Sequence, residues 1–276
     1  MSQSTLPIFV ASSGRSGTRM VSRLLAGIPD LEVHHEYVHT QVQKVACLYA
    51  MGLLTPADAT HAIRELHGGG VYYSSAARFV DASNKVSWVI DRLAEIFPPA
   101  KFVHLIRDGR KVVSSFFNKL SDEIYPDTGV AALQAWIADR RRPMPPPEKK
   151  YWWKIPQGAE PYADRFGGWS QFQRICYHWQ EVNGTIARVL TAIPEERKLT
   201  IKLEDLVSRR EAMEKFLAFF GLPYEERFSA FVQKPDHVFF PLDFKLTPEQ
   251  SDQFNEICGT AMRQFGYSGQ EYNMKY

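Results

Sequence analysis

One segment near the start of the chain combines glycine, hydroxyl and basic residues at a spacing that suits anion binding. It reads Gly14-Arg15-Ser16-Gly17-Thr18-Arg19, between a short apolar run and a stretch with apolar residues at helical spacing. This pattern predicts a strand, a tight loop and a helix. Glycines let the backbone approach an anion, and a helix start offers free N–H groups and a positive dipole end. The segment therefore predicts a phosphate-binding loop, with a plain strand-to-helix turn as the alternative.

A second segment has the same arrangement. Arg107-Asp108-Gly109-Arg110 follows a β-rich run, and Ser114 and Ser115 come a few residues later. Arginine offers planar, bidentate recognition of phosphate. A helix beginning near Gly109 would bring Ser115 towards the same end of the sheet as Arg107. Alone, the segment could equally be a solvated charge cluster, but two such loops in one sheet favour a ligand with phosphates at both ends.

The first loop differs from the usual ATP- or GTP-binding loop, which needs Gly-Lys followed by Ser or Thr. The chain contains no Gly-Lys dipeptide, which argues against ordinary ATP or GTP use. Two other classes stay open. A P-loop small-molecule kinase would need a metal ion and the missing lysine, and a nucleotide-binding module would bind without turnover.

The elements around these loops alternate between strand and helix. Strands are expected at residues 8–11, 31–34, 102–106 and 199–203. Helices are expected at residues 86–96, at about 211–220 before Gly221, and from Thr247, where Pro248 and Gln250 complete a capping box. The three glycines at residues 68–70 predict a loop. This alternation predicts an α/β fold of three layers, with a central parallel sheet covered by helices on both faces.

Composition agrees with a soluble globular protein and excludes several classes. The 276 residues are 45% hydrophobic and 23% charged, and the net charge is +2. This charge does not favour a nucleic-acid partner. The three cysteines are far apart, so neither a disulfide framework nor a cysteine-rich zinc site is expected. The first residues show neither a signal peptide nor a membrane span, so we expect a cytoplasmic protein.

We expect a single domain over residues 1–276, with an insert at about 120–169. Within it, residues 139–154 carry a net charge of +4 and four prolines, which exclude a regular element. Residues 151–179 contain four of the six tryptophans. These aromatic residues either pack in the core or form a wall of a substrate pocket.

The two loops together resemble the signatures of sulfotransferases that use 3′-phosphoadenosine 5′-phosphosulfate. The segment PIFVASSGRSGTRMVSRLL is similar to the 5′-phosphosulfate loop of that family, and KFVHLIRDGRKVVSS to its 3′-phosphate motif. The later LTIKLEDLVSRREAMEKFLAFFGLP and the closing MRQFGY also resemble family segments. The likeness is strongest to the branch that includes tyrosylprotein, carbohydrate and many bacterial enzymes. It implies a sheet of about five parallel strands flanked by helices, with no metal requirement.

The resemblance also implies roles for particular residues. The 5′-phosphosulfate would be held by Arg15, Ser16, Gly17, Thr18 and Arg19. The 3′-phosphate would be held by Arg107 and Ser115. Many bacterial members have a Lys-Thr-Pro-like stretch where this chain has Ala82-Ser83-Asn84-Lys85. Lys85 either takes the place of that lysine or faces solvent.

Sulfuryl transfer needs a base for the acceptor proton and cations for the developing charge, a role that Arg15 would share. We expect the base at the end of a strand neighbouring the Arg15 loop, where His34, His35 and Glu36 lie. Glu36, 21 residues after Arg15, resembles in position the catalytic glutamate of the tyrosylprotein-like branch. It would serve as base if burial raises its pKa. The alternatives are an exposed loop glutamate, a histidine base, or a metal site at these three residues.

The acceptor needs a hydroxyl or amine within reach of Glu36. A small molecule, a glycan or a lipid would each satisfy this. The insert is the natural place for specificity, because aromatic residues stack on sugars or apolar tails and Arg140–Arg142 could meet anionic groups. The sequence gives no indication of the oligomeric state.

Overall fold

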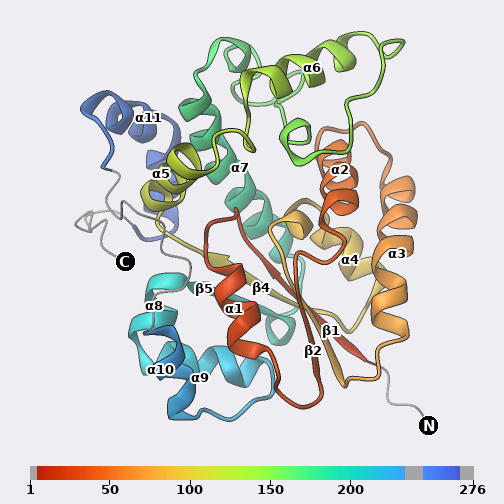
Figure 1. Cartoon of the computed structure of the whole chain (residues 1–276), viewed down its shortest axis with the longest axis vertical. Coiled ribbons are helices and arrows are strands. Elements are labelled where there is room, and N and C mark those ends of the chain that lie inside the picture. The colour runs from red at the N-terminus through yellow and green to blue at the C-terminus, as the bar shows by residue number, and fades with distance from the viewer. Residues whose placement is uncertain (1–4, 234–244, 268–276) are drawn as a thin grey trace.

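The computed structural model describes residues 5–233 and 245–267, and a five-stranded parallel sheet forms the centre of this part (Figure 1). The order across the sheet is β2-β3-β1-β4-β5, and the strands are β1 (Leu6–Ala11), β2 (Leu31–His35), β3 (Arg78–Ala82), β4 (Lys101–Ile106) and β5 (Lys198–Lys202). Strands β1 and β4 are buried along almost their whole length, as expected where helices cover both faces. Because every pairing is parallel, the carboxyl ends of all five strands lie at one edge.

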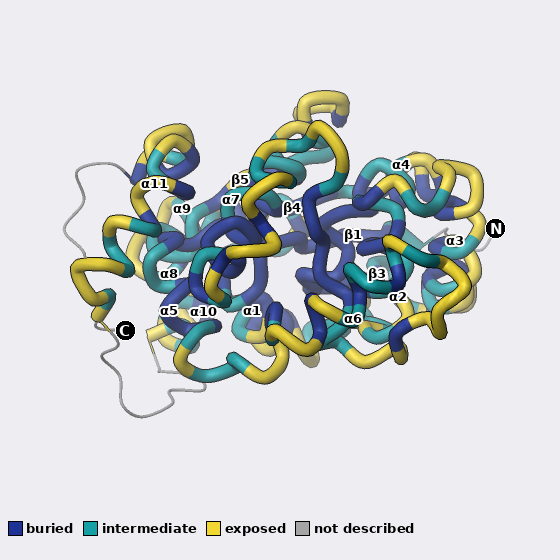
Figure 2. The backbone as a smooth tube through the Cα atoms, turned by 90° about the horizontal axis from the view of Figure 1, so that it is seen from above, coloured by how far each residue is buried: buried dark blue, intermediate teal, exposed yellow. Residues whose placement is uncertain are grey.

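Helices form a layer on each face of the sheet. Ile8 and Val10 of β1 belong to one buried cluster, whereas Phe9 and Ala11 belong to the other, because successive side chains of a strand point to opposite faces. The first cluster includes α1 (Thr18–Leu25), α8 (Leu203–Ser208), α9 (Arg210–Phe219) and α10 (Glu226–Val232). The second includes α2 (His39–Ala50), α3 (Pro56–Tyr72), α4 (Ile90–Ile96), α5 (Gly109–Lys119), α6 (Asp127–Ala138), α7 (Gln171–Leu190) and α11 (Pro248–Gln264). Figure 2 shows the buried backbone gathered around β1 and β4 between these layers, which confirms the predicted three-layer α/β fold.

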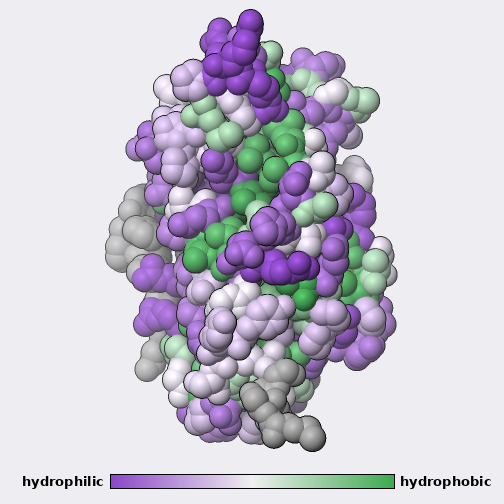
Figure 3. Space-filling view, turned by 90° about the vertical axis from the view of Figure 1, so that its right-hand side faces the viewer, coloured by the Kyte–Doolittle hydropathy of each residue, from purple (hydrophilic) through white to green (hydrophobic). Residues whose placement is uncertain are grey.

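The segment from residue 120 to residue 169 packs into the second buried cluster, the one that contains α7. It contains α6 and two short 3-10 turns, η2 (Lys149–Tyr151) and η3 (Phe166–Gly168), and residues 139–148 form no helix or strand. Trp152, Trp153 and Trp169 are buried, so these aromatic residues belong to the core. The exposed arginines 140–142 lie just beyond α6. Figure 3 shows many hydrophilic side chains at the upper end of the molecule.

Two expectations about individual elements are wrong. Residues 68–70 do not form a loop, because α3 runs through all three glycines. A Cβ on Gly70 would lie 2.7 Å from the hydroxyl oxygen of Tyr37, so this glycine permits close packing within a helix. The helix expected at 86–96 is divided into a 3-10 turn, η1 (Lys85–Trp88), and α4. The turn brings Oγ of Ser87 to 2.8 Å from the carbonyl oxygen of Ser12, a long-range contact that local periodicity does not reveal.

The helix ends predicted from capping residues are confirmed. Gly221 has φ 69° just after α9, which is the left-handed conformation expected there. Thr247 accepts a hydrogen bond from the N–H of Gln250, and the side chain of Gln250 caps the N–H of Thr247 in return.

Candidate active site

The loop between β1 and α1 has a backbone conformation that glycine favours. Gly14, Arg15 and Gly17 have φ values of 85°, 54° and 95°. A Cβ on Gly14 would lie 2.7 Å from Nδ2 of Asn84, and a Cβ on Gly17 would lie 2.8 Å from the side chain of Leu203. The glycines therefore allow both the curvature of the loop and its close packing. The loop leads into the N-terminus of α1, which favours a bound anion.

Serine hydroxyl groups hold this loop in place. Oγ of Ser87 accepts a hydrogen bond from the N–H of Ser12 (3.2 Å) and donates one to the carbonyl of Ser12 (2.8 Å). The N–H of Gly14 donates to Oγ of Ser12 (3.0 Å), and Oγ of Ser16 donates to the carbonyl of Gly14 (3.0 Å). Ser16 is buried, and its hydroxyl proton is used inside the loop. The loop is thus shaped before any ligand binds.

The second loop, between β4 and α5, is shaped by carboxylates. Asp108 caps α5 by accepting a hydrogen bond from the N–H of Arg110 (2.9 Å). The N–H of Asp108 donates to Oε1 of Glu204 (3.0 Å), and the hydroxyl of Tyr267 donates to Oε2 of the same carboxylate (3.0 Å). The closing segment of the described chain therefore supports this loop through Glu204. Arg107 and Ser115 are both buried here.

The two loops contact each other directly. Nη1 of Arg107 donates to the carbonyl oxygen of Arg15 (2.9 Å), and Nε of Arg15 donates to Oγ of Ser115 (2.9 Å). The Ser115 hydroxyl accepts this bond and so keeps its own proton to donate. Residues expected at opposite ends of one ligand thus form a continuous basic group at the carboxyl edge of the sheet.

Glu36 follows β2 directly and has a left-handed backbone, with φ 57°. Its N–H donates to the carbonyl of Ala82 (3.2 Å), and the next N–H, of Tyr37, donates to Oδ1 of buried Asp81 (3.1 Å). Within the described residues, no hydrogen bond or ion pair occupies the half-buried carboxylate of Glu36. The hydrogen bonds of the turn therefore fix the backbone of Glu36, and its carboxylate is open to a ligand.

The position of Glu36 differs from the expectation in one respect. Strand β2 is not next to β1, because β3 lies between them. The chain beyond β3 carries Asn84 and Lys85 to the same edge, between Glu36 and the Arg15 loop. Lys85 is only 2% exposed, so the interpretation of a solvent-facing lysine is wrong.

Lys85 lies in an environment that disfavours its charge. Its Nζ lies 5.0 Å from the ring centroid of Trp153 and has no hydrogen-bond partner in the described structure. Burial lowers the pKa of Lys85 to about 7, and the nearby carboxylate of Glu36 only partly opposes this. An anion at the site would supply the hydrogen-bond acceptor that the amine lacks among the described residues.

The pKa of Glu36 does not follow the expectation that burial raises it. Burial does favour the neutral acid, but the charges of Lys85, His35, Lys149 and His39 together outweigh it. The pKa of Glu36 consequently lies below its ordinary value. Glu36 is therefore a carboxylate at neutral pH, which is the form that accepts a proton.

The two histidines before Glu36 point to different partners. Nε2 of His34 lies 2.8 Å from Oε1 of Glu32, whereas Nε2 of His35 lies 3.3 Å from Oγ1 of Thr18 at the start of α1. Neighbouring strand residues point to opposite faces, so these rings do not converge with Glu36 on one ion. Among the described residues, no group of three or more His, Cys, Asp or Glu side chains is arranged to hold a metal. Arg19 is exposed in the first turn of α1.

Three residues of this site had little or no place in the expectation from sequence. Asn84 packs against Gly14, Ser87 anchors Ser12, and the charge of Lys149, in the insert, helps to lower the pKa of Glu36. A signal for the first existed, because Ser83-Asn84-Lys85 is a polar run directly after a buried strand. Lys149 carried no such signal, since its distance from Glu36 depends on how the insert packs.

In a parallel α/β sheet the carboxyl edge, where these two loops meet, is the usual place for a bound ligand. The sequence model of the sulfotransferase family matches residues 7–145, which include both loops, Glu36 and Lys85. The chain therefore belongs to the sulfotransferase family, whose members transfer sulfate.

Solved structures share this fold at low sequence identity. The sulfotransferase domain from the curacin biosynthetic pathway is 15% identical, with 96% of this chain and 99% of that chain covered and a TM-score of 0.51. The sulfotransferase STF9 from Mycobacterium avium is 13% identical, with 95% and 77% covered and a TM-score of 0.51. No curated protein sequence matches the chain. None of the helices in the described ranges has the length and apolar character needed to span a bilayer.

Proposed function

We propose that this sulfotransferase takes its sulfuryl group from 3′-phosphoadenosine 5′-phosphosulfate and transfers it to a hydroxyl or amine. The observation that carries the proposal is the direct contact of the Arg15 loop with Arg107 and Ser115. A donor with a phosphosulfate at one end and a 3′-phosphate at the other suits two joined anion loops. The buried amine of Lys85, which has no hydrogen-bond partner in the described part of the chain, adds a cation beside them.

In this proposal, the chain divides the donor between its two loops. The 5′-phosphosulfate binds to the backbone from Ser16 to Thr18 and to the side chain of Arg15, with Arg19 at the rim. The 3′-phosphate binds to Arg107 and to the free proton of the Ser115 hydroxyl. Binding the donor requires the guanidinium of Arg15 to divide its contacts between Ser115 and the phosphosulfate.

The reaction is an in-line displacement at sulfur. A new bond forms between the acceptor oxygen or nitrogen and sulfur, and Glu36 takes the acceptor proton. The bond from sulfur to the bridging phosphate oxygen breaks, and its electron pair leaves with 3′,5′-adenosine bisphosphate. Arg15 and Lys85 stabilise the negative charge that develops on the transferring group and on that oxygen.

We assign acceptor choice to the segment of residues 120–169, within a single sulfotransferase domain. Lys149 of this segment contributes to the lowered pKa of Glu36 and forms an ion pair with Glu123 (2.6 Å). This segment thus borders the base, and a small molecule or the end of a glycan or lipid would enter beside it.

Calorimetric titration with 3′,5′-adenosine bisphosphate and with AMP tests the donor. We expect the bisphosphate to bind at least tenfold more tightly, and saturation at about 100 Kd to stabilise the fold by about 2.7 kcal/mol. Arg107→Ala should remove most of the difference between the two ligands, since loss of one partner of a buried charge contact costs about 2–5 kcal/mol. Arg227→Ala, an exposed arginine of α10, is the control and should change neither affinity. Equal binding of AMP and the bisphosphate to the unmodified protein would remove the donor assignment. If the bisphosphate binds more tightly, mass spectrometry of products from a panel of acceptors is the next experiment.

A further inference from the structure

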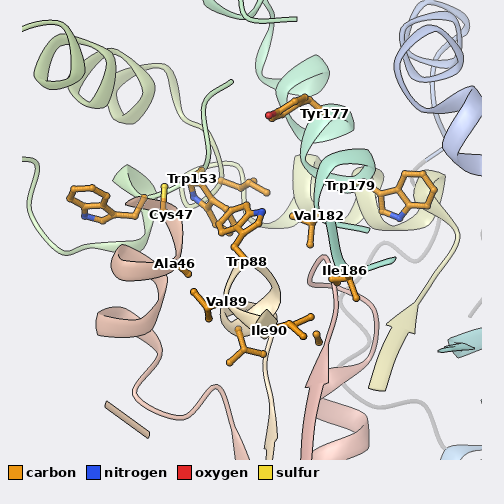
Figure 4. Packing of buried hydrophobic residues seen from close by; sticks show 14 of the residues in the cluster. Ala46, Cys47, Trp88, Val89, Ile90, Trp153, Tyr177, Trp179, Val182 and Ile186 are labelled. Carbon is orange, nitrogen blue, oxygen red and sulfur yellow. The ribbon is translucent and has the colours of Figure 1, made fainter. Parts of the chain in front are cut away.

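One helix, α7, contacts both anion-binding loops through two adjacent side chains. Nε2 of His178 lies 2.9 Å from the carbonyl oxygen of Ser13, in the loop after β1. Nε1 of Trp179 donates to the carbonyl oxygen of Arg107 (3.1 Å), in the loop after β4. Both side chains are buried. Figure 4 shows Trp179 projecting from α7 on a different side from Tyr177.

His178 is fixed as a neutral donor in a single tautomer. A carbonyl oxygen only accepts hydrogen bonds, so Nε2 carries the proton, and Nδ1 has no partner in the described structure. Burial lowers the pKa of His178 to about 3, so the ring stays neutral throughout the physiological range. The ring packs against Trp88, Trp153 and Phe116, with centroid distances of 5.9, 5.0 and 5.9 Å. A ring so enclosed has no room to turn away from Ser13.

Trp179 is fixed equally firmly against the second loop. A Cβ on Gly109, the first residue of α5, would lie 2.8 Å from the indole ring. Nδ2 of Asn183 donates to the carbonyl of Trp179 (2.7 Å), and Oδ1 of Asn183 lies 2.9 Å from Nε2 of His104 on β4. Trp179 and Asn183 together therefore join α7 to the strand, the loop and the helix around Arg107.

We propose that His178 and Trp179 are positioning residues that set the separation of the two loops, so that one donor reaches both. The inference rests on the proposed function, because only a ligand with two separated anionic groups requires that separation. The Arg107–Arg15 and Arg15–Ser115 contacts join the loops directly, but they are made by side chains that also bind the ligand. The α7 contacts are made by carbonyl groups and buried rings that do not depend on ligand binding, so they hold the separation when Arg15 and Ser115 change partners.

The two residues act on different ends of the ligand, and this makes the inference testable. Trp179→Phe keeps an aromatic ring but loses the donor to the Arg107 loop. It should weaken binding of 3′,5′-adenosine bisphosphate by about three- to tenfold, the value of one hydrogen bond, and leave AMP binding unchanged. His178→Leu loses the donor to the Arg15 loop and should weaken both ligands by a similar factor. His178→Gln retains an N–H donor and should restore most of this loss.

Ile186→Ala is the matched control, because Ile186 is a buried residue of the same helix and contacts neither loop through a hydrogen bond. It should lower the melting temperature at least as much as the other variants and leave both Kd values unchanged. If Trp179→Phe and His178→Leu lower the melting temperature but keep the wild-type Kd values, α7 is only a structural support and the inference is overturned. If the unmodified protein itself does not prefer the bisphosphate to AMP, the proposed donor is wrong and the inference is rejected with it.

Discussion

At the scale of single residues, Glu36 combines an open carboxylate with a fixed backbone. We expect Glu36→Gln to lower kcat by about 10²–10⁴-fold, because the amide keeps the size of the side chain but cannot accept a proton. The Kd of 3′,5′-adenosine bisphosphate should hardly change, since in the proposed reaction the carboxylate serves the acceptor. Steady-state kinetics with a reactive acceptor and calorimetry with the bisphosphate give the two values.

His35→Asn is the control for this prediction. His35 precedes Glu36 but contacts Thr18, so its loss should change kcat much less. A large loss of kcat in His35→Asn together with normal turnover in Glu36→Gln would transfer the role of base to His35. Loss of bisphosphate binding in both variants would mean that the turn after β2 has a structural role.

Lys85 should make the rate depend on pH above neutrality. Its pKa of about 7 means that its charge is present below this pH and is lost as the pH rises through it. We therefore expect kcat/KM for the donor, which reports groups of the free enzyme, to fall above about pH 7. Lys85→Met should lower kcat/KM below about pH 7, where the wild-type lysine is charged, and abolish this alkaline decrease. A decrease that persists in Lys85→Met must come from another group.

The same lysine should lower the stability of the fold. In the unfolded chain its pKa is near 10.5, so between about pH 7 and 10.5 the unfolded state binds a proton that the native state does not. Stability conferred by this group therefore rises with pH in that window. Lys85→Met should raise the free energy of unfolding by about 1–4 kcal/mol near pH 6, with a smaller gain near pH 10. Urea unfolding at both pH values measures this, and a pH-independent gain would contradict it.

The sequence alone could place Arg15, Arg107, Ser115 and Glu36 near the carboxyl edge of the sheet because each belongs to a local pattern after a strand, whereas their roles stay predictions. Arginine beside glycine after a strand is a local signal, and so is an acidic residue at a strand end. Lys85 could be placed beside the site but not assigned its burial or its lowered pKa. Those properties depend on Trp153, which lies 68 positions further along the chain and packs there only through the tertiary fold.

At the scale of elements, α3 positions the turn that carries Glu36. A Cβ on Gly70 would lie 2.7 Å from the hydroxyl of Tyr37 and 3.0 Å from the ring of Phe79. Gly70→Ala should therefore displace Tyr37 and the turn beside it. We expect a loss of about 1–3 kcal/mol in the free energy of unfolding and a lower kcat, with the bisphosphate Kd unchanged.

The neighbouring glycine provides the control. A Cβ on Gly69 would meet no atom within 4 Å, and Gly69 is helical. Gly69→Ala should stabilise the protein by up to about 1 kcal/mol, because alanine favours the helix, and should leave kcat unchanged. Urea unfolding and steady-state kinetics measure both effects. If the two substitutions have similar effects, α3 does not position the turn that carries Glu36.

These glycines also show why an element was predicted incorrectly. Three consecutive glycines disfavour a helix on propensity, so the sequence indicated a loop. Helix α3 nevertheless runs through all three glycines, and its close packing against Tyr37 at Gly70 is a tertiary contact that no local pattern contains. Helix ends with their own capping residues, such as Thr247 and Gly221, were predicted correctly because the cap interacts within a few residues.

At the scale of the whole molecule, the three layers could be predicted from the alternation of strands and helices along the chain. That the two loops lie at one edge could be predicted because the strands are parallel. A parallel sheet brings the carboxyl ends of its strands to one edge, so two strand-loop-helix motifs must share that edge. The contact of α7 with both loops was not predictable, because no sequence pattern in residues 171–190 indicates which segments this helix contacts. Such contacts are decided by the packing of the complete chain.

The charge distribution of the assembled site leads to a last prediction, on metal dependence. Phosphoryl-transfer enzymes neutralise the charge of a nucleoside triphosphate with Mg²⁺. In this protein, Arg15, Arg107, Lys85 and the N-terminus of α1 meet at one edge, and fixed side-chain charges stabilise an anionic transition state without reorganisation. We expect the initial rate of sulfuryl transfer to change by less than about twofold after exhaustive EDTA treatment, and added Mg²⁺ to leave it unchanged. ATP in place of the sulfuryl donor should give no phosphorylated product, with or without Mg²⁺. Magnesium-dependent transfer from ATP would instead support the small-molecule kinase alternative, and a strict magnesium requirement with the sulfuryl donor would show that the side-chain charges are insufficient.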